Sequence, residues 1–385
     1  MRLRHFLPAC LLGVVTLASC IQDEALNKEA AIDACTGTNV QFTNALASNR
    51  GFNIYINRGA DLTSQQLTFT IPQGATIAAN DAVTGDSAFT QNEDGTYSAT
   101  LNFGNTNHNR FVTVTSEDGE NRATYLIQII QMELPTEYHF ERLQTTDQPY
   151  HILLEEEAMT TDGLQRVLQW SSGNPGFELT KMYNTDMDFP TVLVENGYVG
   201  RCVKLETRNT GEFGKMVQMY IAAGNLFIGS FDLSNALNAP LESTRFGVQF
   251  YRKPVSLKGY YKYRRGEVYT ESGVEVEGKL DSFDIYAMLY EAEDNAFMLD
   301  GSNGKTDRNI ALLARIDQAD ILETNEWTEF NIPFVPMNGK TVDQQKLREG
   351  KYKLGIVFTS SIEGDYFNGA VGSTLWIDEV ELICE

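Results

Sequence analysis

Three predicted strands carry acidic, amide and aromatic residues on the face opposite their apolar residues. These side chains are Gln249 and Tyr251, Tyr260 and Lys262, and Asp284, Tyr286 and Tyr290. Successive side chains of a strand point to opposite faces, so all seven lie away from the apolar face of their strand. A pyranose offers an apolar C–H face to an aromatic ring and hydroxyl groups to polar partners. The pattern therefore predicts sugar contacts; the alternative is that a loop or the other domain covers these faces.

Two tryptophans occupy different settings. Trp170 leads directly into the loop sequence SSGNPG at 171–176, which makes it a further candidate for ligand contact. Trp327 alternates with Thr328 and Phe330 in a predicted strand, where packing is the expected role.

Asp378 is the candidate metal ligand. In residues 375–382 neither face is uniformly apolar. One face carries Trp376, Asp378, Val380 and Leu382, and the other carries Leu375, Ile377, Glu379 and Glu381. A β-bulge at Asp378-Glu379 would restore the alternation. Alternatively, a buried Asp378 would need an arginine or a structural Ca²⁺ as partner. The oxygen-rich segment 300–307 lacks the spacing of a helix–loop–helix calcium site, so we expect a hydrophilic hairpin there.

The acidic residues do not single out a catalytic pair. Hydrolysis of a glycoside needs two carboxylates about 5–9.5 Å apart, and 52 acidic residues offer many pairs. The acids at 155–157 are adjacent and would diverge around a helix. A serine hydrolase needs a histidine base, and His139 and His151 lie in no recognisable motif. The catalytic residues stay unknown; if the chain is an enzyme, we expect a glycoside hydrolase.

The elements that must position these residues are β-strands. The chain has 385 residues, of which 42% are hydrophobic and 11% aromatic, enough for large cores. Alternating segments in the second part lie at 201–206, 216–221, 245–251, 283–290, 310–316, 327–334, 353–359 and 375–382. The best helical candidate is 152–169, and no alternation of strands and helices indicates a parallel sheet. We therefore predict an all-β protein whose residues 134–385 form a jelly-roll β-sandwich.

The first part is expected to comprise an export signal, a tether and a smaller sandwich. Residues 1–19 combine Arg2 and Arg4 with an apolar run, as a signal peptide does. They end in Leu-Ala-Ser before Cys20, which resembles a bacterial lipobox and implies lipid attachment at Cys20. Residues 20–37 are interpreted as a tether. Residues 38–133 show short strands separated by turns, which predicts an immunoglobulin-like β-sandwich.

Net charge, hydrophobic runs and cysteine content restrict the possible binding partners, membrane spans and disulfide bonds. The net charge of −22 disfavours nucleic acid, whose phosphates an acidic surface repels. Apart from 1–19, no stretch is long and apolar enough to cross a membrane. Beyond Cys20, the exported chain retains Cys35, Cys202 and Cys384. A Cys202–Cys384 disulfide and three free thiols are both open at this point.

Five motifs of the second part occur in order. They are WSSGNPG at 170–176, AAGNLFIG at 222–229, FGVQF at 246–250, GYYKY at 259–263 and GSTLWIDEV at 372–380. Together they resemble the putative carbohydrate metabolism domain (PCMD) family. The resemblance implies a jelly roll behind an immunoglobulin-like module and a link to carbohydrate, without a defined reaction. The last strand also resembles the closing strand of carbohydrate-binding jelly rolls, in which such an Asp supports a structural calcium.

These expectations combine into one functional hypothesis. We expect an outer-membrane lipoprotein, exposed at the cell surface, that binds a polysaccharide or oligosaccharide through its jelly roll. Two alternatives stay open: a glycoside-active enzyme on the same fold, and a structural or adhesin-like surface protein.

Overall fold

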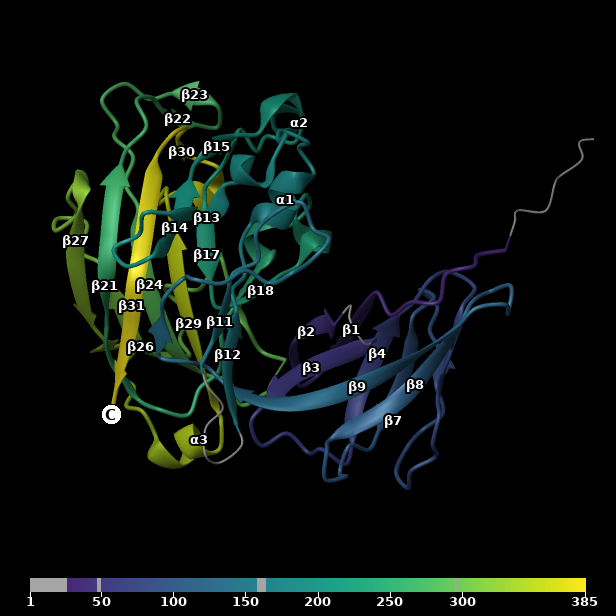
Figure 1. Ribbon diagram of the computed structural model, residues 1–385. Helices are drawn as coiled ribbons and strands as arrows, with labels where there is room; N and C mark the ends of the chain where they lie inside the picture. Colours follow the sequence, from purple (N-terminus) through teal and green to yellow (C-terminus); the bar gives the residue numbers. More distant parts are fainter. Residues whose placement is uncertain (1–25, 47–49, 158–163, 295) are drawn as a thin grey trace, which may run out of the picture.

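The computed structural model describes residues 26–46, 50–157, 164–294 and 296–385. The expected signal peptide and Cys20 lie outside the described residues. Within these ranges no helix has the length and apolar character that a membrane crossing requires. The described chain forms two β-rich domains that lie side by side (Figure 1). The predicted all-β fold is confirmed.

The first domain is a sandwich of two sheets. One sheet has the order β1 (Ala34–Gly37), β4 (Gln65–Thr70), β7 (Tyr97–Leu101) and β6 (Thr90–Gln91). The other contains β5 (Thr76–Ala79), β8 (Asn109–Thr115), β9 (Arg122–Glu133), β3 (Gly51–Asn57) and β2 (Val40–Leu46). Their inward residues, among them Ile54, Phe69 and Val112, form one buried core. The immunoglobulin-like assignment of this domain stays a prediction.

The first domain begins earlier than the sequence suggested. Residues 34–37, assigned above to the tether, form β1 and pair with β4. Ile32 and Cys35 are buried in the core of this domain. Two buried apolar side chains among polar neighbours are too short a pattern to predict a strand from the sequence. Hydrogen bonding to β4 is what makes this segment a strand.

The long strand β9 connects the two domains. Its central residues pair with β3 in the first domain, and its last residues pair with β12 (Gln165–Gln169), which pairs with β11 (Leu154–Glu156). The helix expected at 152–169 is therefore wrong: among its described residues, β11 and β12 form two antiparallel strands. Met132 and Leu134 belong to the core of the larger domain, so the two domains share packed surface.

The larger domain is built on two facing antiparallel sheets. The first, here the platform sheet, has the order β13 (Thr191–Glu195), β14 (Arg201–Glu206), β31 (Thr374–Cys384), β21 (Pro254–Arg264) and β27 (Thr324–Pro333), with β10 (Glu137–Tyr138) beside β31. The second, here the cavity sheet, has the order β17 (Asn225–Phe227), β29 (Tyr352–Thr359), β24 (Asp284–Glu291), β26 (Ile310–Arg315) and β28 (Val335–Pro336), with β20 (Val248–Gln249) beside β29. In Figure 1 the platform sheet faces the viewer.

Short elements complete the larger domain. Three of them cover the outer face of the cavity sheet: β18 (Gly229–Phe231), β19 (Thr244–Phe246) and β25 (Leu299–Asp300). Further short strands are β15 (Arg208–Asn209), β16 (Ile221–Ala222), β22 (Tyr269–Glu271), β23 (Val274–Glu275) and β30 (Gly369–Ala370). The helical turns are α1 (Asn174–Glu178), α2 (Gly211–Met216), α3 (Gln344–Arg348), η1 (Asp186–Asp188), η2 (Leu233–Asn235), η3 (Pro240–Glu242) and η4 (Gly364–Tyr366).

Strand alternation explains which side chains enter the main core. In β21, Tyr261 and Tyr263 are buried between the sheets, whereas Tyr260 and Lys262 lie on the outer face. The predicted bulge in β31 is confirmed: the register with β21 shifts after Asp378, and Glu379 has a φ of +47°. The bulge turns the residues that follow, so that the apolar side chains on both of its sides reach the core.

The structure corrects one further expectation and decides between two alternatives that the sequence left open. Residues 216–221 do not form a strand: α2 ends at Met216, and only Ile221 enters β16. The Cys202–Cys384 disulfide is not formed, because Cys35, Cys202 and Cys384 are all free thiols. The open alternative of free thiols is the one that the structure contains.

Candidate functional site

Four aromatic side chains gather on the outer face of the platform sheet. Tyr198, in the loop between β13 and β14, stacks on Tyr260 of β21 with ring centroids 3.8 Å apart and planes 11° apart. Trp327 of β27 meets Tyr198 edge to face at 6.4 Å. Trp376 of β31 completes the group, here called the aromatic platform. Tyr198 is 48% exposed and the other three are partly exposed, so the platform presents ring surface to solvent.

Lys262 links the two tryptophans of the aromatic platform. Its ammonium lies 4.4 Å from the centroid of Trp327 and 5.7 Å from that of Trp376. Both contacts are in the range of cation–π interactions, which hold the side chain in place. The platform therefore combines flat apolar surface with a fixed hydrogen-bond donor.

Asp378 positions the loop that carries Tyr198. Its Oδ2 accepts the Val199 N–H at 2.9 Å, and its Oδ1 accepts the Glu379 N–H at 2.9 Å. Burial raises the pKa of this carboxyl group to about 6, although these N–H donors favour the ionised form. Gly197 allows the close approach, because a Cβ there would lie 2.6 Å from Asp378 Oδ2. Asp378 thus fixes the stacked tyrosine through the backbone of its loop.

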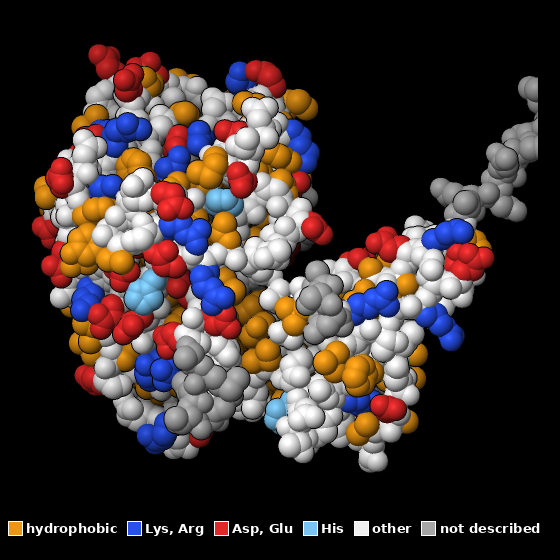
Figure 2. Space-filling view, viewed as in Figure 1, with side chains coloured by type: hydrophobic (Ala, Val, Ile, Leu, Met, Phe, Trp, Pro, Cys, Tyr) orange, Lys and Arg blue, Asp and Glu red, His pale blue; other side chains and the backbone are white. Residues whose placement is uncertain are grey.

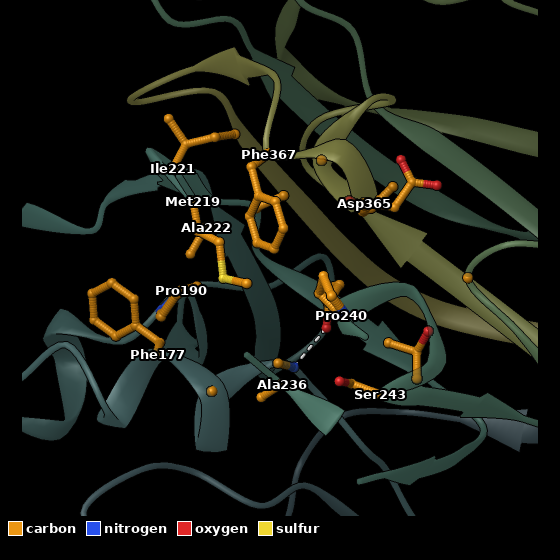
Figure 3. Close-up of a pocket in the computed structure, with 18 of the residues that line it drawn as sticks. Phe177, Pro190, Met219, Ile221, Ala222, Ala236, Pro240, Ser243, Asp365 and Phe367 are labelled. Carbon is orange, nitrogen blue, oxygen red and sulfur yellow. Dashed lines mark hydrogen bonds between the residues drawn. The ribbon is translucent and has the colours of Figure 1, made fainter. Parts of the chain in front are cut away.

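A separate hollow lies on the outer side of the cavity sheet. Figure 3 shows Phe177 of α1, Met219 and Phe367 around it, with Asp365 of η4 at another edge. Its cavity volume is about 160 Å³, similar to engineered protein cavities that bind benzene. Most of the lining side chains are apolar, and Ser243 is a buried exception whose Oγ has no hydrogen-bond partner among the described residues. The hollow suits a small, mainly apolar molecule.

Two acidic residues lie on either side of one lysine at this hollow. Lys305 Nζ is 3.9 Å from Asp284 Oδ2 and 4.0 Å from Asp365 Oδ2. Burial raises the pKa of both carboxyl groups, although Lys305 opposes the shift. Asp284 has no exposed surface, and both its oxygens accept from Arg315 Nε at 3.1 Å. Of the two acids, only Asp365 lines the hollow.

The residues of the larger domain also match a known family model. Residues 139–383 match the family described as Putative carbohydrate metabolism domain, abbreviated PCMD. This chain belongs to the PCMD family. The match confirms the resemblance on which the sequence analysis relied, and it covers both the aromatic platform and the hollow.

Two solved structures are similar to this PCMD chain. One is a protein of Bacteroides thetaiotaomicron described as a putative glycoside hydrolase, with 42% identity and a TM-score of 0.73 over 94% of this chain and 99% of that one. The other is a protein of Bacteroides vulgatus with the same description, with 44% identity and a TM-score of 0.61 over 66% of this chain and 100% of that one. The search of curated proteins found no match. The family and these neighbours support a carbohydrate-related role.

The PCMD fold brings only two of the predicted ligand-binding residues, Tyr260 and Lys262, to the aromatic platform. Trp170 is buried in the main core against Tyr138 and Phe140, so the expectation of ligand contact is wrong there. Its loop neighbours gave no sign of this, because the rings that bury it come from other strands.

Two more predicted ligand-binding residues lie at the contact between the domains. The Tyr251 hydroxyl donates to the backbone oxygen of Arg58 at 2.7 Å and lies 3.2 Å from Gln249 Oε1. The guanidinium of Arg58 also stacks over the Tyr251 ring. The alternative stated above, that the other domain covers these side chains, is the correct one.

The remaining predicted ligand-binding residues lie on β24 of the cavity sheet. Tyr290 is fully buried and its hydroxyl donates to the Phe246 backbone oxygen at 2.6 Å. Asp284 is buried against Arg315. Tyr286 is 5% exposed and reaches the wall of the hollow. None of the three lies on an open sugar-binding face, because both tyrosines belong to a core beneath the short strands and Asp284 is buried against Arg315 and Lys305.

The described parts of the chain contain no cluster of side chains that would support the calcium hypothesis. No group of three or more His, Cys, Asp or Glu side chains there could hold a metal ion. Both carboxylate oxygens of Asp378 already accept hydrogen bonds from backbone N–H groups, those of Val199 and Glu379. The role that the geometry gives this residue is positioning of the Tyr198 loop.

Sequence reasoning missed three members of the aromatic platform. Trp327 was assigned to packing, although its alternation with Thr328 and Phe330 already placed it opposite the core face. Trp376 was not a candidate for ligand contact, because it shares a face with Asp378 in a strand whose alternation is irregular. Tyr198 lies outside any strand, and only the contact with Tyr260 shows where it points.

Proposed function

We propose that this protein binds a polysaccharide or oligosaccharide on the aromatic platform of its PCMD domain. The observation that carries the proposal is the exposed stack of Tyr198 on Tyr260 beside two tryptophans and a fixed lysine. Flat rings take up the C–H faces of sugars, and nearby polar groups bond the hydroxyls. An open sheet face also leaves room for a chain of sugars, which a closed pocket does not.

The hollow on the cavity sheet is the weaker candidate for a sugar site. Its walls are mainly apolar, whereas the hydroxyl groups of a buried sugar each need a polar partner. Its volume of about 160 Å³ also restricts it to a small molecule. A polymer needs the open face instead.

The anchoring of the protein is part of the proposal. A lipid on Cys20 would hold the chain at the outer membrane, with the first sandwich as spacer and the PCMD domain exposed to glycan. Weak binding at each site would then gain avidity from many copies on one surface. Radiolabelled fatty acid should enter the wild-type protein in cells, and a Cys20→Ala variant should not be labelled.

Glycan retention in native gels tests the binding function. The soluble protein without residues 1–20 keeps both domains. This is necessary because Met132 of the linking strand β9 and Leu134 just after it belong to the core of the larger domain. We expect at least one polysaccharide of a broad panel to retard it, and Trp327→Ala to abolish the retardation. Tyr366→Ala is the matched control, since Tyr366 is 60% exposed on η4, away from the platform. Equal retention of the Trp327→Ala variant and the wild type would exclude the platform.

Hydrolysis of a glycoside is the second candidate function. It is favoured by the description of both similar structures as putative glycoside hydrolases and by Asp365, an acid of raised pKa at the hollow. A raised pKa is what a general acid needs near neutral pH. Cleavage of a short glycoside, the size that the hollow can admit, by the wild type but not by Asp365→Asn would support it. Retention without cleavage would leave binding as the function.

A further inference from the structure

Four basic side chains lie at one end of the aromatic platform. Lys262 is held between Trp327 and Trp376, and Lys204 of β14 is the cross-strand neighbour of Trp376. Arg264 follows two residues after Lys262 on the same outer face of β21. Arg208 reaches the same area, where its Nη1 lies 3.1 Å from Glu206. The two tryptophans are thus flanked by positive charge.

Little negative charge balances this end. Glu206 is shared by two of the basic side chains, at 2.9 Å from Lys204 Nζ and 3.1 Å from Arg208. In the described parts of the chain, neither Lys262 nor Arg264 has a carboxylate within 4.0 Å. Among the described residues, Glu206 is thus the one carboxylate within 4.0 Å of these four basic side chains, and the Asp188 carboxylate also interacts with Arg208. With both acids counted, this end is still basic, in a chain whose net charge is −22. Figure 2 looks onto this face of the larger domain, where basic, acidic and hydrophobic side chains are interspersed.

The other end of the platform is acidic. Glu329 is the cross-strand neighbour of Tyr260, and Glu379 lies 2.9 Å from His139 Nδ1. The two ends therefore differ in charge along β21. A ligand with a negative group at every position would be repelled by the acidic end, whereas a ligand with isolated negative groups would fit both ends.

We infer that the platform binds a glycan with isolated uronic acid residues, whose carboxylate lies against Lys262. The inference rests on the proposed function and names the substrate class of the same site. Two cation–π contacts hold the ammonium beside the rings, so a uronate could bond to it while its sugar ring packs on the aromatic surface. Lys204 and Arg264 add to the attraction from the neighbouring positions of the face.

Two pairs of polymers test the inference on the soluble two-domain protein. The first pair is a glucuronoxylan and its carboxyl-reduced form, which share a backbone and differ in charge. The second pair is unsulfated chondroitin and chondroitin sulfate, because a sulfate ester offers the same negative charge as a carboxylate. Affinities are measured by retention in native gels at low and high salt, with Lys262→Gln, Lys262→Arg and Lys258→Gln as variants.

We expect the glucuronoxylan to bind more tightly than its reduced form, and the difference to shrink in high salt. Lys262→Gln should weaken binding of the acidic polymer about threefold to fivefold, the upper part of the range for a partly exposed ion pair. Lys262→Arg should keep most of the affinity. Lys258→Gln is the matched control, since Lys258 lies on the same face of the same strand but is paired with Glu381 at 2.6 Å.

The other outcomes separate the inference from the proposed function. Equal affinity for both xylans, unchanged by Lys262→Gln, would overturn the inference and leave carbohydrate binding intact. Retention of chondroitin sulfate but of no unsulfated uronate polymer would overturn the assignment to a carboxylate. Binding of no glycan in the wider panel as well would refute the proposed function itself.

Discussion

Replacing Tyr260 by alanine should reduce carbohydrate affinity strongly while leaving the fold intact. Tyr260 projects from the outer face of β21 and takes no part in the core between the sheets. Its ring stacks on Tyr198 at 3.8 Å, so the substitution removes one ring of the platform and the support of a second. Both losses bear on the same ligand surface.

The contacts of Tyr260 set the expected losses of stability and of carbohydrate affinity. A stacked aromatic pair contributes about 0.5–1.5 kcal/mol, so the free energy of unfolding should fall by about 1 kcal/mol. Truncating a central aromatic anchor of a binding site costs about 2 kcal/mol or more. Since about 1.4 kcal/mol corresponds to a tenfold change, affinity should fall roughly 30-fold.

Isothermal titration calorimetry with the best-retained oligosaccharide measures this loss, and thermal unfolding measures stability. Tyr260→Phe keeps the ring and should bind nearly as the wild type does. Tyr366→Ala removes an exposed tyrosine elsewhere and should have no effect on affinity. Wild-type affinity in a folded Tyr260→Ala variant would refute the role assigned to the stacked tyrosines.

Three further predictions concern the surroundings of the platform and the stability of the fold. Asp378→Asn should loosen the Tyr198 loop and weaken glycan retention, with near-wild-type circular dichroism; unchanged retention would show that the loop holds without this carboxylate. Burial raises the pKa of Glu155 from 4.5 to about 7, so the folded state favours the protonated form. Its contribution to stability is therefore fully present below about pH 4.5 and is lost as the pH rises through 7. Denaturant titrations should show the free energy of unfolding falling over this pH range in the wild type and not in Glu155→Gln. An equal fall in both proteins would contradict this assignment. Because Cys35, Cys202 and Cys384 are free thiols, a reductant should not change the melting temperature of the soluble protein, and a marked decrease would reveal a disulfide.

Side chains alternate between the two faces along each strand, so the sequence predicts which residues of the platform sheet share a face. Tyr261 and Tyr263 point into the core and Tyr260 and Lys262 away from it, as the alternation indicated. The bulge at Glu379 was also predictable, because without it the apolar residues of β31 could not all reach one core. These are local properties of one strand and depend on no distant partner.

The same alternation could not show which outer faces are covered. Tyr286 and Tyr290 do leave the main core, yet they enter a second one beneath β18, β19 and β25. Tyr251 meets Arg58 of the other domain. In each case the covering residues belong to other elements, and the pattern of a single strand carries no information about them.

The platform itself depends on a loop that the sequence did not place. Tyr198 reaches Tyr260 because the next residue, Val199, donates its N–H to Asp378 in β31, 179 positions after Val199. The acid predicted as a metal ligand was thus correctly recognised as a buried group in need of a partner, but the partner is backbone. A buried carboxylate in a sequence does not reveal which donor satisfies it.

A crystal structure of the soluble two-domain protein with a bound oligosaccharide would test the central claim most directly. The ligand should be a fragment of whichever polysaccharide is best retained in gels. We expect a sugar ring against Tyr198 and Tyr260, with a further sugar near Trp327 and Lys262. An ordered sugar in the hollow between Phe177 and Phe367, with no ligand on the platform, would contradict this claim.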